Sequence, residues 1–270
     1  MPGRSLRLCG MILLGLLLAG PVCIMRRTGR DRIVIRWWMR RLARTLGLRI
    51  RVRGHFPGET SLWCCNHVSW LDIVVLGAIG EFVFVSKSEV GGWPLVGWLA
   101  RAAGTVFLKR GAGHSNSVSR TLEACLQNGQ SIVIFPEGTT TEGLSVKPMY
   151  PRLFNAAVAT ATPVQPVALR FTERGALSSL APFVGDDTFL THLGRLLTHR
   201  EGLDVDLKLL PRINPEGLDR RSLAHATRAI VQSGLNELFD CRFPMTENAP
   251  IDSSGSHSTS YENNLASRAG

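Results

Sequence analysis

The sequence predicts an α/β domain, a layered sheet flanked by helices, with a hydrophobic and amphipathic helical membrane anchor at the N-terminus. Short apolar runs of the strand type alternate with helical patterns, an uncharged run lies near the start of the chain, and arginines cluster directly after it. The 270 residues, 44% of them hydrophobic, are enough for one sizeable domain. We expect an anchor at 1–47, the domain at 48–245 and a disordered tail at 246–270, where Ser, Asn and Gly are frequent.

The uncharged run of the anchor extends from Leu8 to Met25, 18 residues flanked by arginines on both sides. A bilayer-spanning helix needs about 17 to 20 such residues, so the run predicts a transmembrane helix. A cleaved signal peptide is the less favoured alternative, because the run ends without the small residues of a cleavage site. The larger arginine excess follows the run, and the positive-inside rule therefore places the domain on the cytoplasmic side of the inner membrane.

The segment 33–46 has the pattern of a basic amphipathic helix. Projected at about 100° per residue, its arginines at 36, 40, 41 and 44 face away from Val34, Ile35, Trp38, Met39, Leu42 and Leu46. Such a helix beside an anchor is typical of a segment lying among lipid headgroups, and an ordinary core-packing helix with a solvated face is the alternative. A span followed by a surface helix and a hairpin dipping into one leaflet both remain open.

The net charge of +10 comes entirely from the N-terminal part of the chain. Eleven arginines and one aspartate lie between Arg26 and Arg53, two further arginines precede them, and the chain from Gly54 onward therefore carries −2. A domain that is slightly acidic does not favour a groove for a polyanion, and we expect no nucleic-acid partner.

In the domain, the strand and helix patterns follow one another along the chain. The expected strands are 48–53, 61–65, 82–85, 105–108, 131–135, 164–169 and 205–209. The expected helices are 70–77, 95–102, 117–127, 153–160, 189–197 and 221–239. Six cysteines show neither a Cys-x-x-Cys spacing nor a metal-ligand spacing with histidine, so we expect reduced, mostly buried thiols and no metal or cofactor.

The clearest candidate for catalysis is the pair His67 and Asp72, which follows the expected strand at 61–65. On a regular helix the two side chains would lie about 140° apart, so they meet only if His67 is on the loop and Asp72 in the first helical turn. The carboxylate would then orient the imidazole as a general base. A capping box formed by Ser69 and Asp72 is the alternative, and the same spacing recurs at His199 without distinctive neighbours.

Two other loops follow expected strands and carry polar groups. The strand at 131–135 leads into Pro136-Glu137-Gly138-Thr139, and the strand at 105–108 leads into Lys109-Arg110, where a guanidinium could bind a phosphate. Because strand ends at one edge of an α/β sheet gather side chains into a site, these loops support a catalytic interpretation.

These blocks together, in order and spacing, resemble the glycerolipid acyltransferases typified by 1-acylglycerol-3-phosphate acyltransferase, from about Val52 to Leu169. The resemblance implies His67 as general base with Asp72 as its orienting partner. It implies Arg110 as a ligand of the acceptor's phosphate, and Glu137, Gly138 and Thr139 as residues that position the acceptor. The family's Phe-Lys-x-Gly stretch is replaced here by Met-Tyr-Pro-Arg at residues 149–152. This departure leaves the headgroup of the acceptor open.

The resemblance implies a membrane-bound O-acyltransferase that moves an acyl group from acyl-CoA or acyl-carrier protein to a lysolipid hydroxyl. We expect 1-acylglycerol-3-phosphate as acceptor and phosphatidic acid as product. A lyso-ornithine lipid, with a carboxylate in place of the phosphate, is the alternative acceptor within the family.

Two alternatives from other classes remain. A non-catalytic peripheral membrane protein would use the anchor only to place a binding domain. A hydrolase would need a nucleophile such as Ser69 or Cys65, and neither is surrounded by the Gly-x-Ser-x-Gly elbow.

Overall fold

The computed structural model describes residues 2–25, 31–108 and 115–240 of the chain. The strands are β1 Leu48–Arg53, β2 Leu62–Cys65, β3 Val83–Lys87, β4 Val106–Leu108, β5 Ile132–Ile134, β6 Val164–Glu173, β7 Ala176–Leu177 and β8 Leu203–Leu209. The α-helices are α1 Pro2–Met25, α2 Asp31–Leu46, α3 Leu71–Ile79, α4 Ser88–Gly91, α5 Val96–Ala102, α6 Ser115–Gln127, α7 Asn155–Ala159, α8 Phe189–Thr198 and α9 Arg220–Phe239, and the 3-10 helix η2 is Pro151–Phe154.

The strands form a mixed sheet in the order β1-β8-β6-β2-β5-β3-β4, with β7 beside β6. Every neighbouring pair from β6 to β4 is parallel, whereas β8 runs antiparallel to β6 and parallel to β1. The carboxyl ends of β2, β5, β3 and β4 therefore lie along one edge of the sheet. The loops that follow β2 and β5 carry His67, Glu137, Gly138 and Thr139 of the predicted site, whereas Arg110 follows β4 and lies outside the described residues.

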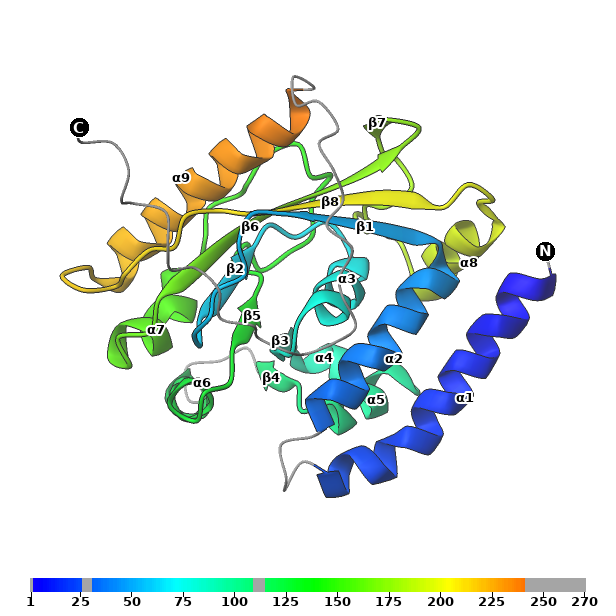
Figure 1. Ribbon diagram of the computed structural model, residues 1–270, viewed down its shortest axis with the longest axis horizontal. Coiled ribbons are helices and arrows are strands. Elements are labelled where there is room, and N and C mark those ends of the chain that lie inside the picture. The colour runs from blue at the N-terminus through cyan, green and yellow to red at the C-terminus, as the bar shows by residue number, and fades with distance from the viewer. Residues whose placement is uncertain (1, 26–30, 109–114, 241–270) are drawn as a thin grey trace, which may run out of the picture.

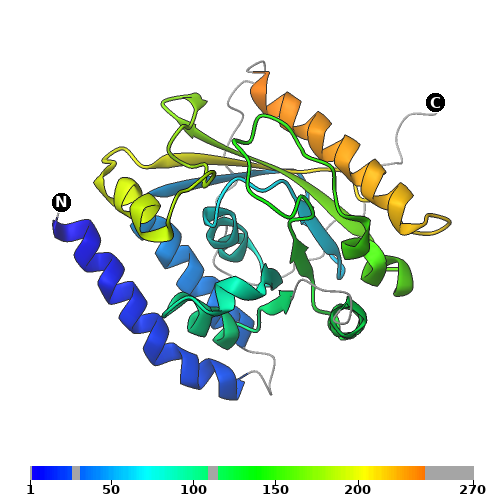
Figure 2. The same cartoon turned by 180° about the vertical axis from the view of Figure 1, so that it is seen from behind.

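The sheet is covered on both faces, and this explains why its central strands are continuous apolar runs. Successive side chains of β5 point to opposite faces, so Val133 packs with Leu71 and Val75 of α3 on one side, while Ile132 and Ile134 pack with α6, α7 and α9 on the other. Figures 1 and 2 show α9 on one side of the sheet and α3, then α2, then α1 on the opposite side. The predicted α/β class with helices on a layered sheet is confirmed.

Helix α2 lies between α1 and α3. The Trp38 Nε1–H donates to the carbonyl of Met11 at 2.9 Å, and a Cβ at Gly15 would lie 2.9 Å from the Trp38 ring, so only a glycine permits this close approach. On the other side of α2, Arg40 Nε donates to the carbonyl of Ala78 at 2.7 Å, in the last turn of α3. Helix α2 is thus packed between two helices along its length.

The arginines of α2 are therefore divided between the protein and its surroundings. Arg36 lies 3.5 Å from Glu81 and Arg40 binds an unpaired helix-terminal carbonyl, which carries partial negative charge. Arg41, Arg44 and Trp37 are exposed, with the Arg41 guanidinium 5.2 Å from the Trp37 ring centroid. Two of the four arginines of the predicted basic face are therefore bound within the protein, Arg36 by Glu81 and Arg40 by α3. Contact of the other two with lipid headgroups stays a prediction.

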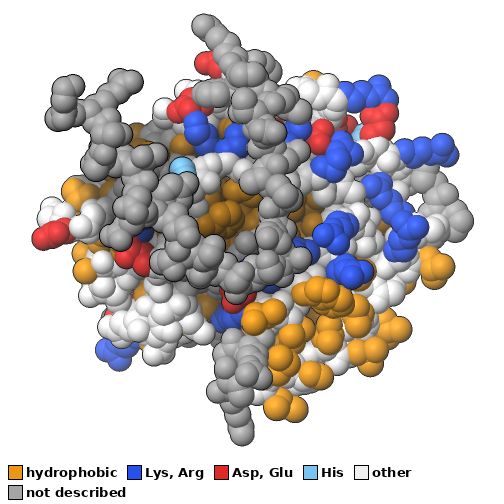
Figure 3. Space-filling view, viewed as in Figure 1, with side chains coloured by type: hydrophobic (Ala, Val, Ile, Leu, Met, Phe, Trp, Pro, Cys, Tyr) orange, Lys and Arg blue, Asp and Glu red, His pale blue; other side chains and the backbone are white. Residues whose placement is uncertain are grey.

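Helix α1 is long and apolar enough to cross a membrane by length and composition, over Gly3–Met25, with a mean hydropathy of 2.4. It does not stand away from the domain. Arg4 donates to the carbonyl of His199, and α1 packs along α2 and α5. Large apolar side chains on its opposite side, Leu6, Leu13, Leu17 and Ile24, are exposed, and Figure 3 shows hydrophobic side chains gathered over this helix.

Most of the expected elements occur within a few residues of their predicted bounds. The predicted helix 153–160 is instead η2 followed by α7, because Pro151 favours a tight first turn. The expectation of mostly buried thiols is wrong for the anchor, since Cys9 and Cys23 are exposed on α1, whereas Cys64 and Cys65 are buried. The predicted tail at 246–270 lies outside the described residues.

We expect Arg40→Met to lower the free energy of unfolding by about 1–3 kcal/mol, because it leaves the Ala78 carbonyl without its charged donor. The exposed Arg44 on the same helix supplies the control. Arg44→Met should change the free energy of unfolding by no more than about 0.5 kcal/mol. Denaturant unfolding of the full chain in detergent micelles measures both. Equal effects of the two substitutions would contradict the assigned role of Arg40.

Candidate active site

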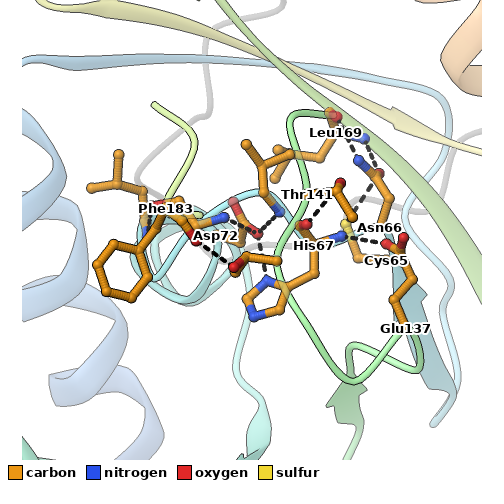
Figure 4. A network of polar contacts seen from close by, with 12 residues as sticks. Cys65, Asn66, His67, Asp72, Glu137, Thr141, Leu169 and Phe183 are labelled. Atoms are coloured by element: carbon orange, nitrogen blue, oxygen red, sulfur yellow. Dashed lines mark hydrogen bonds and ion pairs between the residues drawn. The ribbon is translucent and has the colours of Figure 1, made fainter. Parts of the chain in front are cut away.

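The loop between β2 and α3 brings His67 and Asp72 together. Asp72 is completely buried, and its Oδ2 atom lies 2.7 Å from His67 Nδ1. The same oxygen accepts hydrogen bonds from the backbone amides of Val68, at 2.7 Å, and Ser69, at 3.0 Å (Figure 4). A single carboxylate oxygen therefore fixes both the fold of the loop and the direction of the imidazole.

The capping and catalytic interpretations of this loop are compatible. Asp72 reaches back to the Ser69 amide as the acid of a capping box does. The hydroxyl half of the box is weak, because the Ser69 hydroxyl accepts from the Leu71 amide at a long distance of 3.4 Å. The second His–Asp pair of this spacing forms no such contact. His199 lies 3.5 Å from Glu173, and Asp204 binds Arg49 at 2.7 Å.

The His67 ring is held on several sides and keeps one edge free for chemistry. It stacks on Phe135, with ring centroids 4.2 Å apart, and its side chain is 19% exposed. Because a carboxylate only accepts, we assign the proton to Nδ1, which leaves the Nε2 lone pair available. In Figure 4 this second nitrogen faces away from Asp72. The arrangement suits a general base acting on a hydroxyl.

Glu137 lies directly behind the backbone of His67. Its Oε1 atom accepts from the His67 amide and its Oε2 atom from the Lys147 amide, both at 2.8 Å. The side chain is buried, and burial raises the pKa of the Glu137 carboxyl, an effect that the two hydrogen bonds oppose. In the structure the carboxylate joins three loop segments through their backbones. Its expected contact with an acceptor stays a prediction.

Gly138 and Thr139 follow Glu137 at the carboxyl end of β5. Gly138 has a φ of +66°, and a Cβ at this position would lie 2.5 Å from Cε2 of Tyr150, so the turn requires glycine. Thr139 is exposed, and its hydroxyl lies 3.5 Å from the carbonyl of Thr140. Their roles toward an acceptor stay predictions. Arg110 lies outside the described residues, just beyond the end of β4 at Leu108.

Two further residues of the site were not identified from the sequence. Asn66 exchanges two hydrogen bonds with the backbone of Leu169 in β6, at 2.9 and 2.8 Å, and so fixes the loop to the neighbouring strand. The Thr141 amide and hydroxyl both donate to the carbonyl of His67, at 2.8 and 3.2 Å. Only their position beside His67 and Glu137 along the chain could have indicated them.

The potential nucleophiles of a hydrolase are poorly suited to that role. Ser69 and Cys65 are completely buried, and burial together with the charge of Asp72 raises the pKa of the Cys65 thiol well above its usual value. A thiol that stays protonated in the core is inert. The structure therefore favours the imidazole as the reactive group.

We expect Glu137→Gln to destabilise the fold by about 1–3 kcal/mol, because a glutamine can accept only one of the two backbone hydrogen bonds. Hydrogen exchange at the His67 and Lys147 amides should accelerate. The exposed Glu142 of the same loop gives a matched control, since Glu142→Gln removes the same charge without a buried contact. Unchanged exchange at both amides in Glu137→Gln would show that the bridge is unimportant.

The chain is similar in sequence to known enzymes. The family model described as acyltransferase matches residues 49–170. A lyso-ornithine lipid O-acyltransferase of Pseudomonas aeruginosa is 44% identical over 238 residues, which cover 86% of this chain and 92% of that protein. A 1-acyl-sn-glycerol-3-phosphate acyltransferase of Neisseria gonorrhoeae is 33% identical over 141 residues, which cover 52% of this chain and 55% of that protein.

The fold is also found in a solved structure. The crystal structure of the 1-acyl-sn-glycerophosphate acyltransferase PlsC from Thermotoga maritima matches 89% of this chain and 99% of its own, with a TM-score of 0.60 and 21% sequence identity. The family match includes the loops that carry His67, Asp72 and Glu137. With a relative of 44% identity extending over nearly its whole length, the chain belongs to the acyltransferase family of enzymes.

Proposed function

We propose that this enzyme transfers a fatty acyl group from an acyl thioester to the free hydroxyl of a lyso-ornithine lipid. The observation that carries the chemistry is the 2.7 Å contact between His67 Nδ1 and the buried Asp72 carboxylate. The choice of acceptor is supported by the relative from Pseudomonas aeruginosa, which matches far more of the chain than the glycerophosphate-acylating relative from Neisseria does.

In the proposed mechanism, the acceptor's hydroxyl oxygen attacks the carbonyl carbon of the thioester while His67 Nε2 removes the hydroxyl proton. A C–O bond forms as the C–S bond breaks, and the proton passes from the imidazolium to the departing thiolate. Asp72 stabilises the imidazolium that forms and keeps its Nδ1–H in place. Atoms and charges balance without a covalent acyl-enzyme intermediate.

The loop around Tyr150 supports an acceptor with a headgroup other than glycerol phosphate. Tyr150 stands in the stretch that departs from the glycerophosphate-acylating pattern, and its ring packs on Gly138 at the end of β5. The side chain is 63% exposed, so it can contact a ligand beside the Pro-Glu-Gly-Thr loop. 1-Acylglycerol-3-phosphate is the second candidate, favoured by the relative from Neisseria.

The way in which α1 is held supports a proposal for the placement at the membrane. Because α1 packs along α2 and α5 and binds His199 near its start, we propose that it lies in one leaflet beside the domain and does not cross the bilayer away from it. The exposed Leu13 and Leu17 would enter the acyl region, and Arg41 and Arg44 of α2 would meet headgroups. We propose the cytoplasmic face of the inner membrane, with acyl-CoA or acyl-carrier protein arriving from the cytoplasm.

We expect His67→Ala to lower the rate of acyl transfer by about 10²–10⁴-fold, because the reaction loses its general base. The exposed His225 of α9 provides the control, and His225→Ala should keep the wild-type rate. Product formation from a labelled acyl thioester and each lysolipid, in mixed micelles, measures the effect. Retention of near-wild-type transfer by His67→Ala would end the proposed mechanism.

We expect the purified enzyme to acylate lyso-ornithine lipid with a higher kcat/KM than 1-acylglycerol-3-phosphate. Both acceptors should be presented in the same micelles with the same acyl donor, and the diacyl products separated by mass spectrometry. A preference for the glycerol phosphate acceptor would reverse the assignment of the acceptor. Acylation of neither would favour the non-catalytic membrane protein.

A further inference from the structure

A second histidine supports the catalytic loop from a distant part of the chain. His192 lies on α8, beyond the residues 49–170 that the family model matches, and it is completely buried. Its Nδ1 atom accepts a hydrogen bond from the Trp70 indole Nε1–H at 3.1 Å, and its Nε2 atom lies 3.2 Å from the carbonyl oxygen of Ala181. Trp70 stands between His67 and Asp72 in the sequence.

The partners of His192 determine its protonation state. An indole N–H can only donate, so Nδ1 must carry a lone pair, and a carbonyl oxygen can only accept, so Nε2 must carry the proton. Both contacts are satisfied only by the neutral imidazole with Nε2 protonated. Burial, and then the charge of Arg195, lower the pKa of His192, which agrees with this assignment. The hydrogen bond to Ala181 and the nearby Asp187 act in the opposite direction.

Trp70 transmits this contact to the loop that holds the catalytic pair. Its backbone caps the start of α3, the helix whose first turn carries Asp72. Besides the hydrogen bond, the Trp70 ring contacts Phe189 of α8, with ring centroids 5.0 Å apart. The indole is therefore held by two side chains of one helix, directly at the start of α3.

The other contact of His192 leads to the same loop by a second route. Ala181 begins a segment whose Phe183 amide donates to the carbonyl of Val68 at 3.0 Å, and whose Phe183 carbonyl accepts from the Thr140 hydroxyl. One buried imidazole thus joins two independent supports of residues 67–72, one through a side chain and one through the backbone.

We infer that His192 is a positioning residue of the acyltransferase, which acts through Trp70 to hold the His67–Asp72 loop in its reactive geometry. This inference rests on the proposed function. His192 itself does not exchange protons with a substrate, because both of its ring nitrogens are occupied inside the protein.

Two substitutions separate the two contacts of the imidazole. In His192→Asn the amide oxygen can replace Nδ1 as the acceptor for Trp70, whereas in His192→Gln the longer side chain can replace Nε2 as the donor to Ala181 and leaves the indole unpaired. We expect His192→Gln to lower kcat by about 10- to 100-fold with little change in KM, because a small displacement of catalytic groups has effects of this size. His192→Asn should recover most of the rate, and His225→Gln, on the exposed face of α9, should behave as wild type.

A second measurement reports the contact without activity. The ¹⁵N–¹H resonance of the Trp70 indole, identified by its loss in Trp70→Phe, should shift in His192→Gln and stay near its wild-type position in His192→Asn. Trp70→Phe should lower kcat as His192→Gln does, and the double substitution should be no worse than either alone. If His192→Gln does not fold, Trp70→Phe tests the same link from the other end.

The outcomes distinguish this inference from the proposed function. An active wild-type enzyme whose kcat is unaffected by Trp70→Phe, or equal losses in His192→Asn and His192→Gln, would overturn the positioning role alone. A wild-type protein that transfers no acyl group to either acceptor would refute the proposed function, and the positioning role with it.

Discussion

The Asp72 carboxylate is the constraint on which the rest of the site depends. Burying a charged carboxylate is unfavourable unless hydrogen bonds replace its water, and here one oxygen accepts from two backbone amides and faces the imidazole. The same atom sets the path of the loop, the start of α3 and the tautomer of His67. Any substitution that loosens one of these loosens the others.

The sheet provides the second layer of support, because its parallel strands end at the same edge. The loop after β5 supplies Glu137 and Thr141, which bind the amide and the carbonyl of His67, and β6 supplies the partner of Asn66. In each of these contacts at least one of the two partners is a backbone amide or carbonyl. The Pro-Glu-Gly-Thr block therefore needs its particular residues for a geometric reason. Glu137 is buried and accepts two backbone hydrogen bonds, and Gly138 has the positive φ of the turn that follows.

Local patterns predicted the elements and the meeting of His67 with Asp72, because five residues of chain leave few ways to join them. The contacts of Glu137 were not predictable in this way, since its partners lie 70 and 10 residues away and are backbone amides that carry no sequence signal. His192 lies 122 residues from Trp70, so only the fold relates them. Arginines of α2 looked alike in projection, and only the packing of α2 against α3 and Glu81 divides them.

The two histidines of this region are kept in complementary states. In the proposed reaction His67 accepts a proton and becomes cationic beside Asp72. A second imidazolium packed against the same loop through Trp70 would oppose that step, because like charges disfavour one another in a poorly solvated interior. Burial and the adjacent Arg195 lower the pKa of His192 and so keep that ring neutral. In the proposed mechanism one imidazole serves the chemistry and the other serves support. Their partners set this division, a carboxylate for His67 and an indole N–H for His192.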